Sequence, residues 1–527
     1  MKVSLCLPFN KRRISPQPYY VENLGIQYIS SFLQANEFDC RVIVADGAYL
    51  SEEATVDTVL SGKPDLIGFS PSVDTSALVL RMCKSIRQQY PHAKICLGGQ
   101  HATYFALDIL DNESCIDFVV MGEGEETMLG LCNSLRTGGQ LPLPARGLAF
   151  RRGAHAVSSG SVVLERPLDF YPPPERGILG DLAARGDYAM PMVLTSRGCP
   201  NRCSFCSSHD FFGGVWRTRN PLAVVDEMES ICSTYGFTHF YFVDDQILGR
   251  GLSDKAHLMG IVEEILQRRL HRRYDLYSFV MMRADFHRVL TSDELRRFRL
   301  AGFKDIFVGF ESGSDDELKL FAKGLTAASY GDVFRLAETF FIEGGFILFH
   351  PYATVTSLLA DARLIRRLGV PNWGYYSKRL VPYPGTGLFD RMKDDDSLIE
   401  CSYSSIRYRL HDDHIESIYN AVTLVENDLG GIDDDVFAVV DAYHKTRLSD
   451  VLHSASEPDR SRVPYVKLQS LCDRLAEFYY DSFLSLVTEP HSASTHRTIV
   501  SGCERLAGHI LDEYALLVRE GKLHGHR

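Results

Sequence analysis

The sequence has little of what a membrane protein, a secreted protein or a nucleic-acid-binding protein needs. No apolar run approaches the ~18 residues of a membrane span, and the first residues have the pattern of a strand, not of a cleavable signal peptide. Lys and Arg number 56 against 68 Asp and Glu, so a broad phosphate-binding surface is not expected. We therefore expect a cytoplasmic protein with no membrane or nucleic-acid partner.

The 13 cysteines do not form the pattern of a disulfide framework. Their number is odd and they are scattered over 527 residues, whereas disulfide frameworks belong to short secreted chains. Three lie together within residues 199–206. Most of the others stand alone in apolar stretches, as buried core thiols do; examples are Cys6, Cys83, Cys96, Cys472 and Cys503.

The chain is too long for one core, and its patterns divide it into four parts. Residues 1–140 and 191–400 alternate short apolar strands with helical stretches, 141–190 form a connector with a hairpin, and 401–527 are helical. The predicted fold class is α/β, with an N-terminal doubly wound (Rossmann- or flavodoxin-like) sheet, a partial (β/α)6 barrel and a C-terminal helical domain. Six barrel strands are predicted, at Val193–Thr195, Phe240–Val243, Ser278–Met281, Ile306–Phe310, Gly345–Phe349 and Tyr376–Leu380.

The predicted strands of the first part end in glycines and hydroxyl-bearing residues. Doubly wound sheets bind ligands at the carboxyl ends of their strands. Glycine there lets the backbone approach a bulky ligand, and hydroxyls supply short hydrogen bonds. A response-regulator-like or nucleotide-binding sheet carries similar loops, so these residues alone leave the ligand open. The candidate binding residues are Ser72, Thr75, Gly98, Gly99, His101, Gly122, Glu123 and Gly124.

The chemistry of the barrel is concentrated directly after its first strand. Cys199, Cys203 and Cys206 have the spacing Cys-x3-Cys-x2-Cys. Three thiolates on one loop can hold three irons of a 4Fe–4S cube and leave the fourth iron open to another ligand. His209 could instead complete a Cys3His zinc site. Zinc sites usually join two separated ligand pairs, and barrels build their active sites after their strands, so the cluster is favoured.

This cysteine loop at the start of a six-strand barrel resembles that of the radical SAM superfamily, and the resemblance extends over about residues 190–400. It implies that the three cysteines hold a 4Fe–4S cluster whose open iron binds S-adenosyl-L-methionine (SAM). Phe242–Asp245 is similar to the family's acidic second-strand motif, and Gly309–Ser314 to its segment beside the SAM ribose. Phe346–Pro351 departs from the usual glycine-rich fifth strand, which leaves the adenine contacts open. The candidate SAM-binding residues are Asp244, Asp245, Arg283, Glu311 and Ser312.

The glycine-rich loops 98–103 and 122–127 then resemble the cobalamin-binding domain that some radical SAM enzymes carry in front of the barrel. They contain no Asp-x-His-x-x-Gly, the motif whose histidine replaces the cofactor's own base. Asp412 and His414 form an Asp-x-His, but Ser417 stands at the glycine position and the segment lies in the C-terminal part. The resemblance therefore implies cobalamin bound base-off, without a histidine ligand.

The resemblance implies a cobalamin-dependent radical SAM methyltransferase that moves a methyl group from methylcobalamin to an unactivated carbon. The substrate would be a small biosynthetic molecule, and a flavodoxin or ferredoxin would supply electrons. A rearrangement, ring contraction or cyclisation is the alternative within the family, and a zinc-stabilised scaffold is the alternative without catalysis. Methylthiolation of tRNA is disfavoured by the acidic charge and the helical tail. The sequence singles out no catalytic residue besides cofactor ligands, and it does not identify the substrate.

Overall fold

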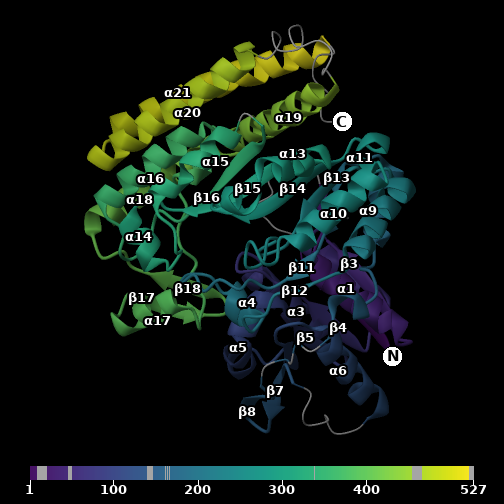
Figure 1. The fold of residues 1–527 in the computed structure, drawn as a ribbon. Helices are drawn as coiled ribbons and strands as arrows, with labels where there is room; N and C mark the ends of the chain where they lie inside the picture. The colour runs from purple at the N-terminus through teal and green to yellow at the C-terminus, as the bar shows by residue number, and fades with distance from the viewer. Residues whose placement is uncertain are drawn as a thin grey trace.

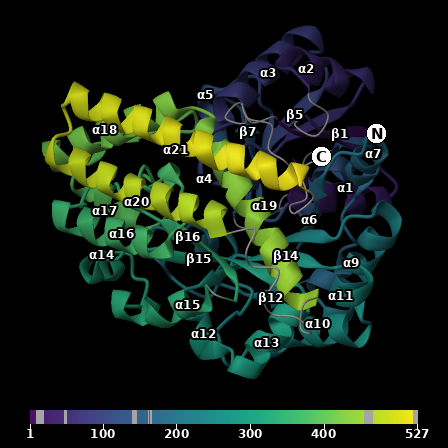
Figure 2. The same cartoon turned by 90° about the horizontal axis from the view of Figure 1, so that it is seen from above.

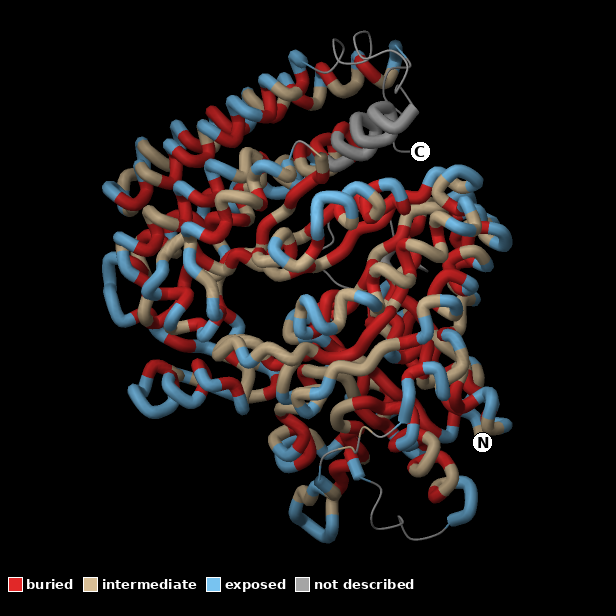
Figure 3. The backbone as a smooth tube through the Cα atoms, in the orientation of Figure 1, coloured by how far each residue is buried: buried red, intermediate tan, exposed pale blue. Residues whose placement is uncertain are grey.

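The computed structural model spans the chain, and the structure is described for all residues except 9–19, 46–49, 139–145, 161, 163, 165, 338, 454–465 and 521–527. It consists of an N-terminal sheet, a second sheet that forms a partial barrel, and a C-terminal layer of helices (Figure 1). Buried residues are concentrated in the strands of both sheets and on the inner faces of the helices (Figure 3). The predicted α/β fold class is confirmed.

The N-terminal sheet has seven strands in the order β3-β1-β4-β5-β6-β7-β8, and its first five are parallel. Two separate apolar cores cover its faces, which is why its central strands are continuous apolar runs. The strands are β1 Lys2–Leu7, β3 Asp39–Val44, β4 Leu66–Phe69, β5 Lys94–Leu97, β6 Phe118–Val120, β7 Leu148–Arg152 and β8 His155–Ser158; α1 Leu24–Ala35 and α6 Glu125–Thr137 cover one face, and α2 Glu52–Ser61, α3 Ser76–Gln89, α4 Gly99–Tyr104 and α5 Ala106–Asn112 the other.

The β7–β8 hairpin, predicted as part of the connector, pairs antiparallel with β6 and extends the N-terminal sheet. The connector continues through α7 Gly177–Arg185 to β9 Ala189–Met190, which pairs with β2 Tyr20–Val21. The connector therefore contacts both sheets. It begins as an edge of the first sheet and ends beside the first strand of the second.

The barrel sheet has five parallel strands in the order β10-β13-β14-β15-β16. The sixth predicted strand, Tyr376–Leu380, is wrong as a strand: it contacts the sheet through a single bridge between Phe349 and Arg379. A 3-10 turn, Trp373–Tyr375, immediately precedes it and leaves little extended chain to pair. The strands are β10 Met192–Val193, β13 His239–Phe242, β14 Tyr277–Arg283, β15 Phe303–Glu311 and β16 Phe341–Phe346; α9 Pro221–Tyr235, α10 Ala256–Gln267, α11 Leu270–Arg273, α12 Phe286–Val289, α13 Ser292–Leu300, α14 Asp315–Leu320, α15 Gly331–Leu336 and α16 Val355–Leu368 accompany them.

Four long helices form the C-terminal layer on the side of the barrel away from the N-terminal sheet (Figures 1 and 2). The predicted apolar stripe of the third, α20, is buried and packs toward α16. His414 lies at the start of the first, α18, with its Nε2 atom 3.0 Å from the Val487 carbonyl oxygen of α20, so this Asp-x-His serves helix packing. The helices are α18 Asp413–Leu429, α19 Ile432–His453, α20 Val466–Thr488 and α21 Ala493–Arg519. In the described part of the chain, none is both long and apolar enough to cross a membrane.

A carboxyl group joins this helical layer to the barrel. Asp433, near the start of α19, accepts a hydrogen bond from the backbone N–H of Trp373 at 3.0 Å and one from the Tyr479 hydroxyl at 2.8 Å. Burial raises the pKa of Asp433 to about 6. The turn before residue 376 and two C-terminal helices are thus held by one side chain.

Replacement of Asp433 by Asn should change the pH dependence of stability. The pKa of Asp433 is raised above the ~3.9 of an unfolded Asp, so its stabilising contribution is complete below about pH 3.9 and is lost as the pH rises toward 6. The stability of the unmodified protein relative to Asp433→Asn should therefore fall by about 2 kcal/mol between about pH 4.5 and about pH 7.5. Thermal midpoints measure this; Asp473→Asn, at an exposed position of α20, should show no such change, and a pH-independent Asp433→Asn effect would contradict the prediction.

Candidate functional site

The cysteine loop has a fixed backbone. Gly198 has φ +93°, and a Cβ atom there would lie 2.0 Å from the Val215 carbonyl oxygen, so only glycine can precede the first cysteine. Within the loop, the Ser204 amide donates to the Phe321 carbonyl at 2.9 Å and its hydroxyl to the Leu320 carbonyl at 2.7 Å. These bonds attach the loop to the end of α14. The three thiols are therefore presented by a short segment with little freedom.

The three thiols are half-buried, and one of them, that of Cys203, lies beside two cations. Burial raises the pKa of all three, whereas Lys323 and Arg283 oppose this rise at Cys203. The Arg283 guanidinium lies 3.9 Å from the Cys203 Sγ atom and donates to the Lys323 carbonyl at 2.8 Å. Soft sulfur donors next to cations that favour thiolate fit an iron–sulfur cluster. A cavity of about 340 Å³ adjoins the loop; it is lined by Arg202, Cys203, Ser204, Cys206, His209, Asp210, Thr386 and Gly387.

His209, the fourth ligand of the alternative zinc site, has its Nδ1 atom 3.3 Å from the Cys199 carbonyl oxygen. Its ring lies under Gly214, where an added Cβ atom would meet the ring at 2.6 Å. Among the described residues, no three His, Cys, Asp or Glu side chains form a group that could hold one metal ion. This holds for the three loop cysteines as well, so the side-chain positions do not distinguish the zinc site from the iron–sulfur cluster, and both assignments stay predictions.

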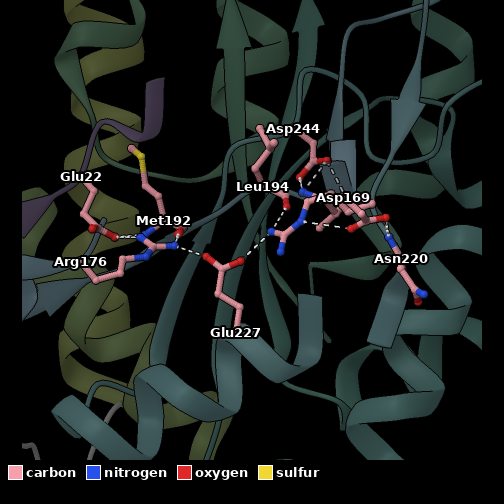
Figure 4. Close-up of polar contacts among 10 residues, drawn as sticks. Glu22, Asp169, Arg176, Met192, Leu194, Asn220, Glu227 and Asp244 are labelled. Carbon is pink, nitrogen blue, oxygen red and sulfur yellow. Dashed lines mark hydrogen bonds and ion pairs between the residues drawn. The ribbon is translucent and has the colours of Figure 1, made fainter. Parts of the chain in front are cut away.

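The two acidic residues of the second-strand motif have different surroundings. Asp244, labelled in Figure 4, is 1% exposed. It accepts hydrogen bonds from the Thr195 hydroxyl at 2.8 Å and the Ser196 hydroxyl at 2.5 Å. Burial raises the pKa of Asp244 to about 6. Asp245 is exposed and accepts from the Ser208 hydroxyl at 2.7 Å, just after the third cysteine. Asp244 therefore supports the chain that leads to the loop, and Asp245 presents its carboxylate beside it.

The fourth-strand segment, Gly309–Ser314, also contains one buried supporting residue and one residue near the cysteine loop. Glu311 has φ +68° where the pairing of β15 with β16 shifts register, and its carboxylate lies 2.8 Å from the buried Lys323 ammonium. A non-glycine residue with positive φ stores strain, which is concentrated at functional sites. Ser312 is fully buried behind the strand, with its hydroxyl 2.7 Å from Glu317 and 2.6 Å from Asp361. Of these two residues, Glu311 is thus the one connected to the cysteine loop, because its ion-pair partner Lys323 lies beside Cys203.

A second cavity, of about 350 Å³, lies between the two sheets. Five of the residues predicted from the glycine-rich loops line it: Gly98, Gly99, Gly122, Glu123 and Gly124. The second sheet and the loops that follow its strands contribute Leu194, Val243, Phe211 and Phe212 to the lining. A mostly apolar cavity with bare backbone on one wall fits a large, flat cofactor.

The other three predicted residues of the N-terminal sheet have structural contacts. Thr75 Oγ1 accepts a hydrogen bond from the Ser72 amide at 2.9 Å in the turn that begins α3. The His101 Nε2 atom lies 2.7 Å from the Tyr403 carbonyl oxygen, and burial lowers the pKa of His101. Tyr403 belongs to the turn between β17 Leu398–Ser402 and β18 Ser405–Tyr408, which packs on the N-terminal sheet.

A buried ionic network, which the sequence motifs did not identify, joins the cavity to the cysteine loop. Arg197, two residues before Cys199, donates to Glu123 at 2.9 Å and to Glu125 at 2.7 Å. Arg217 also pairs with Glu123. The exposed fraction of these side chains is 12% or less. The only sequence signal was the pair of glutamates in a glycine-rich loop, because the two arginines occur in no recognised motif.

A second network connects the connector to both sheets (Figure 4). Arg176 pairs with Glu22, which precedes α1, and with Glu227 of α9. Glu227 accepts from Arg219 at 2.6 Å, and Arg219 donates in turn to the Leu194 carbonyl at 2.9 Å. The chain that leads from β10 to the cysteine loop is therefore held from both sides.

Comparisons with known proteins agree with this geometry. A B12-binding domain model matches residues 15–131. An uncharacterized methyltransferase of Pyrococcus horikoshii is 28% identical over 70% of this chain and 77% of its own length. An anaerobic magnesium-protoporphyrin IX monomethyl ester cyclase of Cereibacter sphaeroides is 27% identical over 72% of this chain and 61% of its own, so the match spans about three fifths of that relative.

Two solved structures share the fold. The cobalamin-dependent S-adenosylmethionine radical enzyme OxsB, with aqua-cobalamin and S-adenosylmethionine bound, matches with a TM-score of 0.71 and 17% identity over 99% of this chain and 81% of its own. The radical S-adenosylmethionine methyltransferase TsrM of Kitasatospora setae, with cobalamin and a [4Fe-4S] cluster bound, has a TM-score of 0.60 and 17% identity over 76% of each chain. The predicted resemblance is confirmed.

Bulk at Gly124 should weaken cobalamin binding. An added Cβ atom would meet the Ile29 Cδ1 atom at 2.7 Å, so a larger side chain must displace Ile29 or fill the cavity that both residues line. Gly124→Val should weaken hydroxocobalamin binding about tenfold or more, a loss of about 1.4 kcal/mol, measured by absorbance titration. Gly130→Val is the matched control, since an added Cβ atom there has nothing within 4 Å. Equal affinities of the two variants would contradict the assignment of the cavity.

Proposed function

We propose that this chain, which has the fold and the sequence resemblance of a cobalamin-dependent radical SAM enzyme, transfers a methyl group from methylcobalamin to an unactivated carbon of a small molecule. The observation that carries the proposal is the arrangement of two sites across one interface. The glycine-lined cavity and the cysteine loop belong to different sheets and are joined by the buried pairs of Arg197 with Glu123 and Glu125. A methyl carrier and a radical source could therefore serve one substrate.

In this proposal Cys199, Cys203 and Cys206 hold the 4Fe–4S cluster. When bound, the cluster with SAM supplies a 5′-deoxyadenosyl radical, and cobalamin supplies the methyl group. Asp245 and Glu311 are the proposed contacts of SAM, because their carboxylates lie beside the cysteine loop and the Lys323 ammonium. A flavodoxin or ferredoxin is the proposed electron source.

Base-off cobalamin without a histidine ligand is also part of the proposal. His101 is the histidine of the glycine-rich loops, and its Nε2 atom is engaged with the Tyr403 carbonyl at 2.7 Å. The ring is enclosed by Phe105 and Tyr403, at centroid distances of 5.1 and 5.0 Å. These contacts favour a structural role for His101.

Aromatic rings form the inner face of the barrel and are the proposed substrate wall. Tyr241 and Phe279 stack with centroids 4.3 Å apart, and Phe307 lies 6.4 Å from Phe279 on the next strand. Gly345 lies on the neighbouring strand β16, where a Cβ atom would come within 2.8 Å of the Phe307 ring. Aromatic surfaces of this kind suit a small substrate with a flat or apolar part.

The cluster assignment predicts the iron and sulfide content of the protein and the effect of replacing each cysteine. Anaerobically reconstituted protein should contain about four irons and four sulfides. Replacement of Cys199, Cys203 or Cys206 by Ala should abolish SAM cleavage, whereas Cys472→Ala, in the core of α20, should leave the absorbance spectrum of the cluster unchanged. Protein that binds only zinc, and loses it in His209→Ala, would support the non-catalytic scaffold instead.

The proposed reaction predicts how many molecules of each SAM-derived product are formed per methylation. Each methylation should yield one S-adenosylhomocysteine, from remethylation of the carrier, and one 5′-deoxyadenosine, from the radical step. Cobalamin omission should stop the first product and methyl transfer. Cyclisation is the second candidate, because the cyclase of Cereibacter sphaeroides is among the relatives; it would give 5′-deoxyadenosine with little S-adenosylhomocysteine. Mass spectrometry with methyl-labelled SAM decides between them, and a product without label under full turnover would exclude methyl transfer.

A further inference from the structure

Helix α4 of the N-terminal sheet contacts the cysteine loop directly. The Gln100 side-chain amide donates to the Ser207 hydroxyl at 2.7 Å, and the Tyr104 hydroxyl donates to the Ser207 carbonyl at 2.7 Å. Ser207 follows Cys206 in the chain and is itself buried. The hydroxyl and the carbonyl oxygen of the residue next to the third cysteine are therefore both held by the other domain.

The same helix begins at the glycine-lined cavity. Gly98 and Gly99 line this cavity, and Gly99, with φ +84°, would place a Cβ atom 2.8 Å from the Ser70 hydroxyl. Thr103, one turn further along α4, accepts a hydrogen bond from the Gly122 amide at 3.0 Å. This short helix, which contains most of the first glycine-rich segment, thus contacts both the second one, 122–127, and Ser207 at the end of the cysteine loop.

The chain that leaves the cysteine loop returns to the cavity. Ser207 is the N-cap of α8, Ser208–Phe211, and its carbonyl oxygen accepts from the Phe211 amide at 2.9 Å. Phe211 and Phe212 line the cavity together with Gly98 and Gly99. Displacement of Ser207 would therefore move one cysteine ligand and one wall of the cavity together.

We infer that Gln100 and Tyr104 are positioning residues that couple occupancy of the glycine-lined cavity to the geometry of the cysteine loop. The inference rests on the proposed function, in which cobalamin fills the cavity and the cluster sits on the loop. Burial raises the pKa of Tyr104, which keeps its hydroxyl a donor. Coupling of two binding sites is reciprocal, so each cofactor must strengthen the binding of the other by the same factor.

The affinity for hydroxocobalamin tests the coupling in the full chain. Absorbance titration should give at least about fivefold tighter binding to cluster-reconstituted protein than to iron-free protein, the lower end of typical site coupling. In the Gln100→Ala, Tyr104→Phe double variant this ratio should fall to about one. The affinity of the iron-free double variant should stay near that of the unmodified protein. Gln89→Ala, Tyr90→Phe, a matched pair at the end of α3, should keep the full ratio.

The reciprocal measurement is the chelator concentration that removes half of the iron at equilibrium. Hydroxocobalamin should raise this concentration at least about fivefold in the unmodified protein and not in the double variant, because the coupling factor is the same in both directions. Tyr104→Phe alone keeps the ring packing and should give an intermediate ratio, which separates lost coupling from misfolding. Independent binding of the two cofactors, or a double variant with the full ratio, would overturn the inference and leave the proposed function intact. Failure to bind iron or hydroxocobalamin at all would instead refute the proposed function.

Discussion

The buried pairing of Arg197 with Glu123 and Glu125 is the interaction on which the arrangement of the two sites depends. Charges this deeply buried are stable only when paired, and removal of one partner of such a pair typically costs about 3–5 kcal/mol. Arg197 stands two residues before the first cysteine, and both glutamates stand in a glycine-rich loop of the cavity. Any rearrangement that separated the sheets would leave a charge unpaired. The distance between cavity and cysteine loop is therefore fixed by electrostatics.

The backbone conformation also restricts the geometry of the cavity and the cysteine loop. Gly198 has no room for a side chain beside Val215, and Gly99 has none beside Ser70. Both glycines have positive φ; Gly198 directly precedes Cys199, and Gly99 is the first residue of α4 at the glycine-lined cavity. The Glu311 backbone also has positive φ, without the freedom of glycine. Conformational restriction of this kind holds reactive groups in one geometry, which a radical reaction requires because water and side chains must be kept from the radical.

Much of the fold could be predicted because it follows from patterns local in sequence. Alternation of apolar strands and helices predicted both sheets, and five of the six predicted barrel strands overlap a strand of the second sheet. The bounds of two were displaced: Val193–Thr195 shares only Val193 with β10, and Gly345–Phe349 shares only Gly345 and Phe346 with β16. The sixth was wrong because Tyr376 follows a turn whose N–H groups are held by Asp433, 57 or more residues away. The partners of Arg197 and Ser207 could not be predicted from the sequence either, because contacts between distant segments leave no pattern in the local sequence. Motifs locate a loop in the sequence, but they do not show which other domain contacts it.

The sequence does contain a pattern that indicates which of the adjacent residues Asp244 and Asp245 is buried. In a strand, alternate side chains point to opposite faces, and Phe240 and Phe242 belong to the outer core of the barrel. Asp244 continues that series and is buried, whereas Asp245 belongs to the other series and is exposed. On β15 the buried Val308 and Phe310 are followed by the buried Ser312, although the positive φ of Glu311 and the register shift there interrupt the regular alternation. Each motif of adjacent polar residues at the end of a barrel strand thus contains one buried residue that supports the chain and one that lies nearer the cysteine loop. On β13, the alternation of buried apolar residues in the strand before the motif indicates that Asp244 is buried and Asp245 is exposed.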